Sequence, residues 1–235
     1  MRVKMRFLKL NFEFFDAFIK EIITQWYIIY RERGNMSKLY FRYGAMGCGK
    51  TMQLLQVAFN YEERGHKVLV MKPKTDTKNG EKLLTRIGPE RKVDFCFSKD
   101  DDIFQFVSKN LKKWRKNVAC VLVDEAQFLT AKQVDELMKV VTEFNIPVMA
   151  YGLRLNFRLT DGGFEGATRL LQIAHDIDEI KTICECGRKA TCNARFLNGK
   201  FVSKGPDVLI DDGKTKIEYR AICPKCFAEY QEGKK

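Results

Sequence analysis

The sequence predicts an α/β fold, with a mainly parallel β-sheet covered by helices on both faces and a small metal-binding domain at its C-terminal end. From Lys38 onward, short apolar stretches typical of strands alternate with stretches of helical periodicity. A glycine-rich motif at Gly44–Thr51 joins one predicted strand to a helix. Two close cysteine pairs follow near the end of the chain, and they indicate a domain held by a metal rather than by a large core.

The first half of this pattern alternates regularly. Its expected elements are, in order, a strand at 39–43, a helix from Lys50 to about Arg64, a strand at 67–71 and a helix at 100–114. Gly65 supplies the stop signal of the first helix, and Pro73 ends the second strand. Residues 79–99 have no clear period, so we interpret them as a loop with a short strand near 93–97.

The second half continues the alternation. Its expected elements are a strand at 118–123, a helix from Thr130 to Phe144, a strand at 148–151, a helix at 163–175 and a strand at 179–183 that leads into the first cysteine pair. The run at 118–123 is continuously apolar, which is typical of a strand buried on both faces. Ligands of such sheets bind at the carboxyl ends of the strands, where the glycine-rich and acidic motifs fall.

Composition excludes a disordered chain and indicates a reducing environment. A length of 235 residues fits one ordinary domain with a small appendage, and 45% hydrophobic residues suffice for a core. The net charge of +12 is dispersed; we interpret the run Lys109–Lys116 as a solvated helix end rather than a DNA-binding patch, because a basic chain also suits ATP. Eight cysteines without a secretory cleavage signature favour metal-bound thiolates over disulfides.

Residues 1–35 stand apart from this pattern. They are rich in aromatic and aliphatic residues, but charged residues interrupt every apolar run before it reaches the ~18 residues of a membrane span. One interpretation is an amphipathic helix that docks on the core or on a membrane surface. The other, which we favour, is a misassigned start, because Glu32-Arg33-Gly34 can be encoded by a purine-rich ribosome-binding site just before Met36.

The segment Gly44–Thr51 fits the phosphate-binding pattern G-x-x-x-x-G-K-[ST] in full. Its glycines let the backbone approach and wrap phosphate groups, whose oxygens then face N–H groups at the start of a helix. Lys50 supplies a positive charge for the β- and γ-phosphates, and Thr51 supplies a hydroxyl ligand for Mg²⁺. The motif follows a strand and opens a helix, which is the context that distinguishes it from a structural glycine turn.

Two carboxylates, Asp124 and Glu125, come directly after the buried strand at 118–123. Asp124 is suited to hold Mg²⁺, and Glu125 to accept a proton from an attacking hydroxyl group or water. A helix-capping acidic pair is the structural alternative, and burial of the preceding strand weakens it.

Four cysteines form two pairs with metal-ligand spacing: Cys184, Cys186, Cys223 and Cys226. Four thiolates select Zn²⁺ in tetrahedral geometry, and with no position left for water the ion is structural. Free buried thiols are the alternative. The remaining cysteines, Cys48, Cys96, Cys120 and Cys192, are interpreted as small buried residues.

These motifs together resemble the zinc-containing thymidine kinases of bacteria and animal cytosol, from about Lys38 to Tyr230. The resemblance is carried by five segments in the same order: YGAMGCGKT at 43–51, DEAQF at 124–128, YGLRLNFR at 151–158, IKTICECGRKAT at 180–191 and YRAICPKCF at 219–227. It implies a RecA-like P-loop core at 36–183 and a zinc domain at 184–235, whose "lasso" loop closes over the nucleoside. It also implies transfer of the ATP γ-phosphate to the 5′-hydroxyl of thymidine.

The resemblance assigns a role to each matching residue. Glu125 is implied as the proton acceptor, and Thr51, Asp124 and Asp76 as the Mg²⁺ site. Met46, Phe128, Phe157 and Tyr219 are implied as nucleoside contacts. The expected ATP and phosphate contacts are Gly44, Ala45, Met46, Gly47, Cys48, Gly49, Lys50, Thr51, Asp124 and Gln127. The family further implies a cytoplasmic homotetramer that dTTP inhibits, with no nucleic-acid or membrane partner.

Two departures from the family pattern concern substrate contacts. Lys78 stands where an arginine is usual, so a bidentate phosphate contact is lost there, although Arg86 matches a downstream arginine. The lasso usually contains Ile-Gly-Gly, whereas this chain has Ile210-Asp211-Asp212-Gly213. We therefore expect altered backbone contacts to the base.

Two other classes of function are open from the residues alone. A nucleic-acid-stimulated ATPase would use DEAQ as a helicase box and the cysteines as a zinc ribbon, but the chain is too short for a second RecA-like domain. A non-catalytic zinc adaptor would not need Lys50, Thr51, Asp124 and Glu125 together.

Overall fold

The computed structural model describes residues 36–76, 80–85, 88–114, 117–158, 163–206, 209 and 215–234. The chain divides into two units, Met1–Ser37 and Lys38–Lys235. Of the first unit only Met36 and Ser37 are described, so both interpretations of residues 1–35 lie outside the described residues. The following account concerns the second unit.

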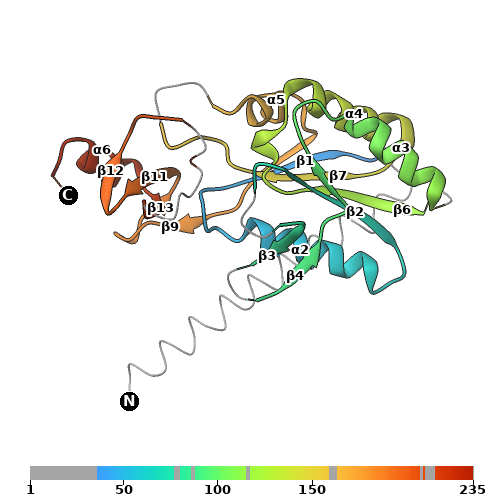
Figure 1. The fold of residues 1–235 in the computed structure, drawn as a ribbon, viewed down its shortest axis with the longest axis horizontal. Coiled ribbons are helices and arrows are strands. Elements are labelled where there is room, and N and C mark those ends of the chain that lie inside the picture. The colour runs from blue at the N-terminus through green and yellow to red at the C-terminus, as the bar shows by residue number, and fades with distance from the viewer. Residues whose placement is uncertain are drawn as a thin grey trace, which may run out of the picture. The chain divides into compact units, whose positions relative to one another are not determined.

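The second unit contains a six-stranded sheet with the strand order β5-β2-β6-β7-β1-β8 (Figure 1). All five pairings between neighbouring strands are parallel. The strands are β1 Leu39–Tyr43, β2 Lys67–Pro73, β5 Phe95–Phe97, β6 Val118–Val123, β7 Val148–Gly152 and β8 Asp176–Glu179. The predicted α/β class with a mainly parallel sheet is confirmed.

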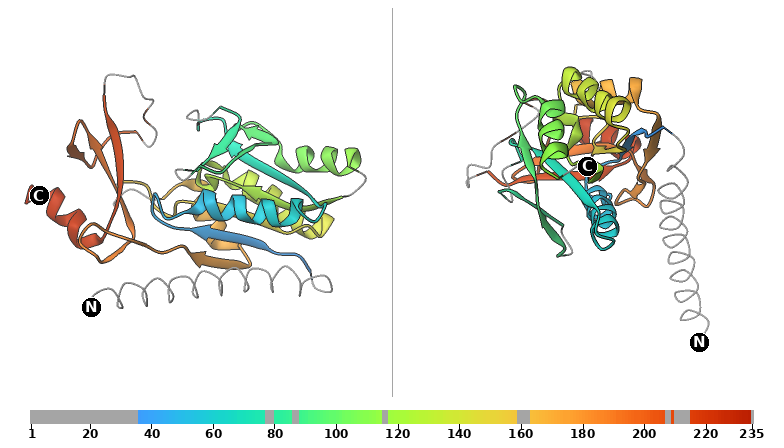
Figure 2. Two further views of the ribbon diagram at one scale, coloured as in Figure 1. Left: turned by 90° about the horizontal axis from the view of Figure 1, so that it is seen from below. Right: turned by 90° about the vertical axis from the view of Figure 1, so that its right-hand side faces the viewer.

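Helices cover both faces of this sheet (Figures 1 and 2). They are α2 Lys50–Glu62 on one face, and α3 Ile103–Lys113, α4 Ala131–Phe144 and α5 Glu165–Ile173 on the other. Apolar residues of β1, β6 and β7 pack with α3, α4 and α5 in one core cluster. The predicted cap of α4 is confirmed: the Thr130 side chain accepts from the Gln133 N–H, and the Gln133 side chain accepts from the Thr130 N–H.

The C-terminal end of α3 is exposed to solvent, as the sequence predicts. Lys112 and Lys113 lie in the last turn of α3 and are exposed, as predicted for a solvated helix end, while residues 115–116 lie outside the described residues. No helix in the described ranges is long and apolar enough to cross a membrane.

The interpretation of residues 79–99 as a loop with one strand is incomplete. The expected strand is β5, but an antiparallel hairpin of β3 Lys82–Leu84 and β4 Glu90–Lys92 precedes it. Only Leu83 of the hairpin strands is buried, so the hairpin lacks the apolar alternation that reveals strands in a sequence. An ion pair across the strands, Lys82 Nζ to Glu90 Oε1 at 2.7 Å, accompanies the backbone pairing.

The single strand expected at 179–183 is wrong. The chain forms β8, which ends at Glu179, and a separate strand β9 Thr182–Ile183 that belongs to another sheet. The Ile180 N–H donates to Tyr43 O at the end of β1, and the chain then leaves the main sheet. The preceding helix α5 also stops at Ile173, short of the predicted end at His175.

The C-terminal part builds its own small core. Strand β11 Cys192–Leu197 lies between β12 Lys200–Val202 and β13 Ile217–Ile222 in an antiparallel sheet (Figure 1), and β9 pairs with β10 Lys189–Ala190. Helix α6 Pro224–Gln231 follows. The buried residues of this core are Cys184, Ala190, Cys192, Ala194, Phe196, Ile222, Cys223, Cys226 and Phe227.

Two of the cysteines interpreted as buried are partly exposed. Cys120 and Cys192 are buried as expected, but Cys48 and Cys96 are not. Cys48 lies in the turn before α2, and Cys96 lies on β5 at the edge of the sheet, so neither is enclosed on all sides.

Candidate active site

The glycine-rich turn connects β1 to α2, as the motif requires. Gly49 directly precedes the helix with φ +92°, in the left-handed region that favours glycine. A Cβ atom at Gly44 would lie 2.4 Å from Ile180 O and 2.5 Å from Cys48 Sγ, so a side chain cannot fit there. The turn therefore exposes backbone N–H groups at the start of α2, where an anion is stabilised.

Lys50 lies within this turn and is 7% exposed. Its Nζ donates to Gly44 O at 3.1 Å and to Ala45 O at 3.0 Å. These bonds hold the ammonium group beside the phosphate-binding backbone.

Thr51 and Asp124 connect the turn to the end of β6. Thr51 Oγ1 donates to Asp124 Oδ2 at 2.9 Å, although the two residues are 73 positions apart. Asp124 is 2% exposed, and its own N–H donates to Met71 O in β2. Burial and the neighbouring charge of Glu125 raise the pKa of Asp124 well above its ordinary value, and the Thr51 hydroxyl bond opposes this shift.

The donors gathered here fit Mg²⁺. A hydroxyl group and two adjacent carboxylates are hard oxygen ligands, and a cation beside them would stabilise the ionised form of the buried Asp124. Asp76, the third expected Mg²⁺ ligand, bonds to a different residue: its carboxylate accepts from Lys72 Nζ at 3.2 Å. Within the described residues no hydrogen bond joins Asp76 to Thr51 or Asp124. Lys72 is fully buried, and the sequence analysis did not single it out.

Glu125 occupies an unusual backbone conformation between β6 and the 3₁₀-helix η2 Ala126–Phe128. Its φ of +49° lies in the left-handed region, which is costly for a residue with a side chain and is typical of functional sites. Gln127 Nε2 donates to Glu125 Oε2 at 2.5 Å, and Gln127 Oε1 accepts from the Leu153 N–H at 2.9 Å. A buried amide thus connects Glu125 to the segment after β7.

The space that Gln127 occupies depends on Gly152, the last residue of β7. A Cβ atom at Gly152 would lie 2.9 Å from Gln127 Oε1 and 3.1 Å from Gln127 N. Glycine at this position therefore allows the amide to reach Glu125.

The four expected nucleoside contacts lie in separate elements. Phe128 packs edge-on against Phe164, with ring centroids 5.5 Å apart. Phe157 is 3% exposed, and the Arg195 guanidinium lies 3.5 Å from its ring centroid. Tyr219 stands opposite Arg195 in the pairing of β13 with β11, so both side chains lie on one face of that sheet.

The remaining expected nucleoside contact, Met46, lies in the glycine-rich turn, and its N–H donates to Asn193 Oδ1 in β11 at 2.8 Å. The departures at Lys78, Arg86 and Ile210–Gly213 lie outside the described residues.

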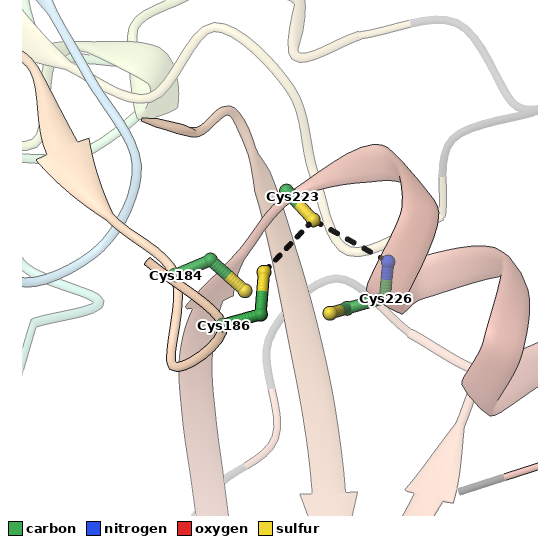
Figure 3. Close-up of side chains that lie close together, drawn as sticks. All are labelled: Cys184, Cys186, Cys223 and Cys226. Atoms are coloured by element: carbon green, nitrogen blue, oxygen red, sulfur yellow. Dashed lines mark hydrogen bonds between the residues drawn. The ribbon is translucent and has the colours of Figure 1, made fainter. Parts of the chain in front are cut away.

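The four paired cysteines come together (Figure 3). Cys184, Cys186, Cys223 and Cys226 place their sulfur atoms within 4.8 Å of one another. Gly187, with φ +81°, shapes the turn of the first pair, and Cys223 caps α6, where its sulfur accepts from the Cys226 N–H at 3.4 Å. Pro224 is the first residue of α6, directly after Cys223.

This arrangement fits a tetrahedral zinc ion. Zinc–sulfur bonds of about 2.3 Å imply sulfur–sulfur distances of about 3.8 Å in a tetrahedron. The sulfur atoms of Cys186 and Cys223 lie 3.6 Å apart, and all four lie within 4.8 Å of one another. The pKa of Cys186 is lowered, chiefly by a hydrogen bond from the Arg188 backbone and by the neighbouring thiols, so the thiolate form that binds metal is favoured. Three of the cysteines are buried and Cys186 is exposed.

Sequence reasoning missed two residues of β11 that face the site. Arg195 is 1% exposed, and its Nη1 and Nη2 atoms donate to Pro206 O and Lys204 O, both at 2.6 Å. Asn193 contacts the glycine-rich turn. The signal was the alternation in Cys192–Leu197, where polar residues at 193 and 195 interrupt an otherwise apolar strand.

The fold and site define a P-loop nucleotide-binding protein, with an acidic pair beside the phosphate loop and a four-cysteine cluster. The sequence profile of the thymidine kinase family matches residues 37–227. The chain belongs to the thymidine kinase family.

Curated relatives agree with this assignment. A thymidine kinase of Francisella tularensis subsp. holarctica is 43% identical over 198 residues, which cover 83% of this chain and 98% of that protein. A thymidine kinase of Streptococcus pyogenes serotype M3 is 43% identical over 194 residues, which cover 82% of this chain and 97% of that protein.

A structural likeness to a helicase is slight. The Pif1 helicase of Candida albicans superposes with a TM-score of 0.38 at 13% identity, over 68% of this chain and 39% of that chain. This value is too low to bear on fold or function, and the nucleic-acid-stimulated ATPase gains no support from it.

Proposed function

We propose that this chain transfers the γ-phosphate of ATP to the 5′-hydroxyl of thymidine and so forms dTMP, a precursor for DNA synthesis. Family membership gives the reaction class. The observation that carries the assignment of the site is the hydrogen bond from Thr51 to Asp124, because it joins the phosphate loop to the acidic pair at one edge of the sheet.

The phosphate loop binds ATP through its backbone and Lys50. The proposed contacts are Gly44, Ala45, Met46, Gly47, Cys48, Gly49, Lys50, Thr51 and Asp124. Gln127, the remaining contact that the resemblance implies, has both ends of its amide bonded to protein groups, and we propose that it acts on Glu125 instead. Lys50 moves from its carbonyl partners to the β- and γ-phosphates, since a phosphate oxygen is a stronger partner for an ammonium group than a carbonyl is.

Thr51 and Asp124 hold the Mg²⁺ that accompanies ATP, and Asp76 is proposed as a further ligand. When bound, Mg²⁺ neutralises charge on the phosphates and fixes their orientation. The Thr51–Asp124 hydrogen bond keeps both oxygens in place before nucleotide binds.

Glu125 acts as the general base. Its carboxylate accepts the 5′-hydroxyl proton of thymidine while the hydroxyl oxygen bonds to the γ-phosphorus and the bond to the β-phosphate oxygen breaks, which leaves ADP. The Gln127 amide holds one carboxylate oxygen and leaves the other to receive the proton.

Replacing Gln127 by methionine is expected to lower kcat about tenfold, because a lost hydrogen bond leaves Glu125 free to turn away. The KM for ATP should stay within about twofold of wild type, since both amide bonds go to protein groups. Steady-state kinetics with varied ATP separates the two roles of Gln127: a raised KM with unchanged kcat would show that it binds nucleotide. Gln105→Met, on the exposed face of α3, is the matched control.

The nucleoside is proposed to lie between the phosphate loop and the C-terminal sheet, in contact with Met46, Phe128, Phe157 and Tyr219. Support comes from the neighbourhood of Arg195, which stacks on Phe157 and stands opposite Tyr219 in the sheet. Aromatic faces of this kind can hold a pyrimidine base by stacking. The C-terminal domain at 184–235 thus closes the site of the kinase domain at 36–183.

We expect purified protein to contain about one zinc ion per chain, held by Cys184, Cys186, Cys223 and Cys226. Replacing Cys223 by serine should remove most of the zinc and lower the melting temperature, because Cys223 both binds the metal and caps α6. Elemental analysis and thermal unfolding measure this. Cys192→Ala changes the same core but removes none of the four ligands, and it should keep its zinc. Active protein devoid of zinc would refute the assignment.

Incubation with radiolabelled ATP and either thymidine or single-stranded DNA tests the reaction itself. The expected result is labelled dTMP with thymidine and no stimulation by DNA. Release of phosphate that depends on DNA, with no labelled dTMP, would instead establish an ATPase.

We propose three further properties on the strength of the family resemblance: a homotetramer, inhibition by dTTP and a cytoplasmic location. We propose that dTTP binds in the thymidine site, so it should compete with thymidine, and inhibition kinetics at varied thymidine tests this. Light scattering of the purified protein tests the tetramer.

A further inference from the structure

Strand β11 presents two different faces. Cys192, Ala194 and Phe196 belong to the buried core around the four cysteines, whereas Asn193 and Arg195 alternate with them and point to the other side. On that side Asn193 contacts residues of the nucleotide-binding domain. The strand therefore lies between the cysteine cluster and the phosphate loop.

Asn193 uses both ends of its side-chain amide. Its Oδ1 accepts from the Met46 N–H at 2.8 Å, and its Nδ2 donates to Leu155 O at 3.1 Å. Asn193 is 3% exposed, so water does not compete for these bonds. The amide oxygen faces an N–H group and the amide nitrogen faces a carbonyl oxygen. If the amide were turned over, neither group would have a suitable partner.

The two partners belong to different parts of the site. Met46 is the third residue of the phosphate loop, and Leu155 lies two residues after Leu153, whose N–H is held by Gln127. Asn193 thus ties the phosphate loop to the segment that Gln127 connects to Glu125.

A small depression of about 10 Å³ lies at this junction, lined by Tyr43, Gly44, Ala45, Arg154, Leu155, Glu179, Thr191 and Asn193. The hydrogen bonds of Asn193 fix the loop beside this depression, because hydrogen bonds are directional and water does not compete with a buried side chain.

We propose that Asn193 is a positioning residue for ATP binding, which holds the phosphate loop at Met46 and makes the shape of the loop depend on the intact four-cysteine cluster. The inference rests on the proposed function of the loop as the ATP site. The bond to Met46 fixes the loop before ATP arrives, and so reduces the ordering that binding requires. Cys192, the neighbour of Asn193 in β11, packs in the cysteine core. Loosening of that core would therefore displace Cys192 and, with it, the Asn193 side chain.

The test measures the dissociation constant of a non-hydrolysable ATP analogue by calorimetry, first for the wild-type protein. Binding there confirms the ATP site independently of Asn193. The variant Asn193→Ala should bind the analogue roughly tenfold more weakly, from the loss of two buried hydrogen bonds. Asn193→Ser keeps one polar atom and should give an intermediate loss, which tests the idea if the alanine variant does not fold.

Asn198→Gly is the matched control. Asn198 lies in the turn directly after β11, with φ +48°, and its Oδ1 accepts from the Lys216 N–H. Glycine at this position preserves the backbone and removes the same side-chain amide at a site whose hydrogen bond does not go to the phosphate loop. It should bind the analogue like wild type. Equal weakening in Asn198→Gly and Asn193→Ala would reveal general loosening and overturn the proposal, as would wild-type binding by both Asn193 variants.

Zinc removal by a chelator supplies the second measurement. In the wild type it should weaken analogue binding toward the value of Asn193→Ala, whereas in Asn193→Ala it should add little, because the link is already broken. Equal effects of zinc removal on both proteins would show that the cluster does not act through Asn193, and would contradict the proposal.

Discussion

Replacing Lys50 by alanine is expected to abolish phosphoryl transfer, with a loss of at least about 10³-fold in kcat/KM. The γ-phosphate would lose its nearest positive charge just as negative charge shifts toward the bridging oxygen in the transition state. Lys50 is almost fully buried, and its Nζ is held at the loop by Gly44 O and Ala45 O. Transfer of labelled phosphate to thymidine, measured over a range of ATP concentrations at saturating thymidine, reports the loss.

The Lys50 variant needs a check on folding, because Lys50 also binds Gly44 O and Ala45 O within the loop. A thermal unfolding curve close to that of wild type would assign the loss to chemistry. Lys74→Ala is a matched control: Lys74 is exposed, pairs with Asp101 and should leave activity unchanged. Normal activity of Lys50→Ala would contradict the assignment of Gly44–Thr51 as the phosphate-binding loop.

Glu125→Gln is expected to lower kcat by about 10² or more while ATP binding stays nearly intact. Glutamine retains the size of the side chain and an oxygen that can accept from Gln127, but it cannot take up the 5′-hydroxyl proton. The loss of the neighbouring negative charge also removes one cause of the raised pKa of Asp124, so the Mg²⁺ donors remain ionised. ATP affinity should therefore survive.

The two effects of Glu125→Gln are separated by measuring analogue binding and single-turnover phosphoryl transfer on the same preparation. Glu143→Gln, an exposed residue near the end of α4, makes the same chemical change outside the site and should be silent. Turnover of Glu125→Gln within a few-fold of wild type would place the base elsewhere.

Several parts of the site could be predicted from the sequence because their residues are close together in it. Gly44–Thr51 is a continuous segment whose glycines and terminal lysine are needed at fixed offsets, and the structure places it between β1 and α2 as predicted. The acidic pair follows the continuous apolar run of β6, whose burial is visible in the sequence. Each cysteine pair is local, and meeting of the two pairs follows from the number of thiolates a zinc ion takes.

Other features had no local signal. The β3–β4 hairpin has only one buried residue in its strands. The break after β8 comes where its neighbour β1 ends at Tyr43, and no periodicity of residues 179–183 reveals that limit. Gln127 was placed with the phosphate contacts, although in the structure its amide bonds to Glu125 and Leu153. The direction of such a side chain depends on where β7 brings Leu153 and on the space left by Gly152.

The sequence by itself determined the α/β class, the phosphate loop, the acidic pair and the four paired cysteines, because each depends on residue type at short spacing. Only the tertiary structure decided how these parts are joined. Asn193 reaches Met46 across 147 positions of sequence, and Arg195 reaches Phe157 from the same strand. Contacts over such separations form only after the sheets have brought the chain segments together. Local periodicity in the sequence does not show which distant segments will meet.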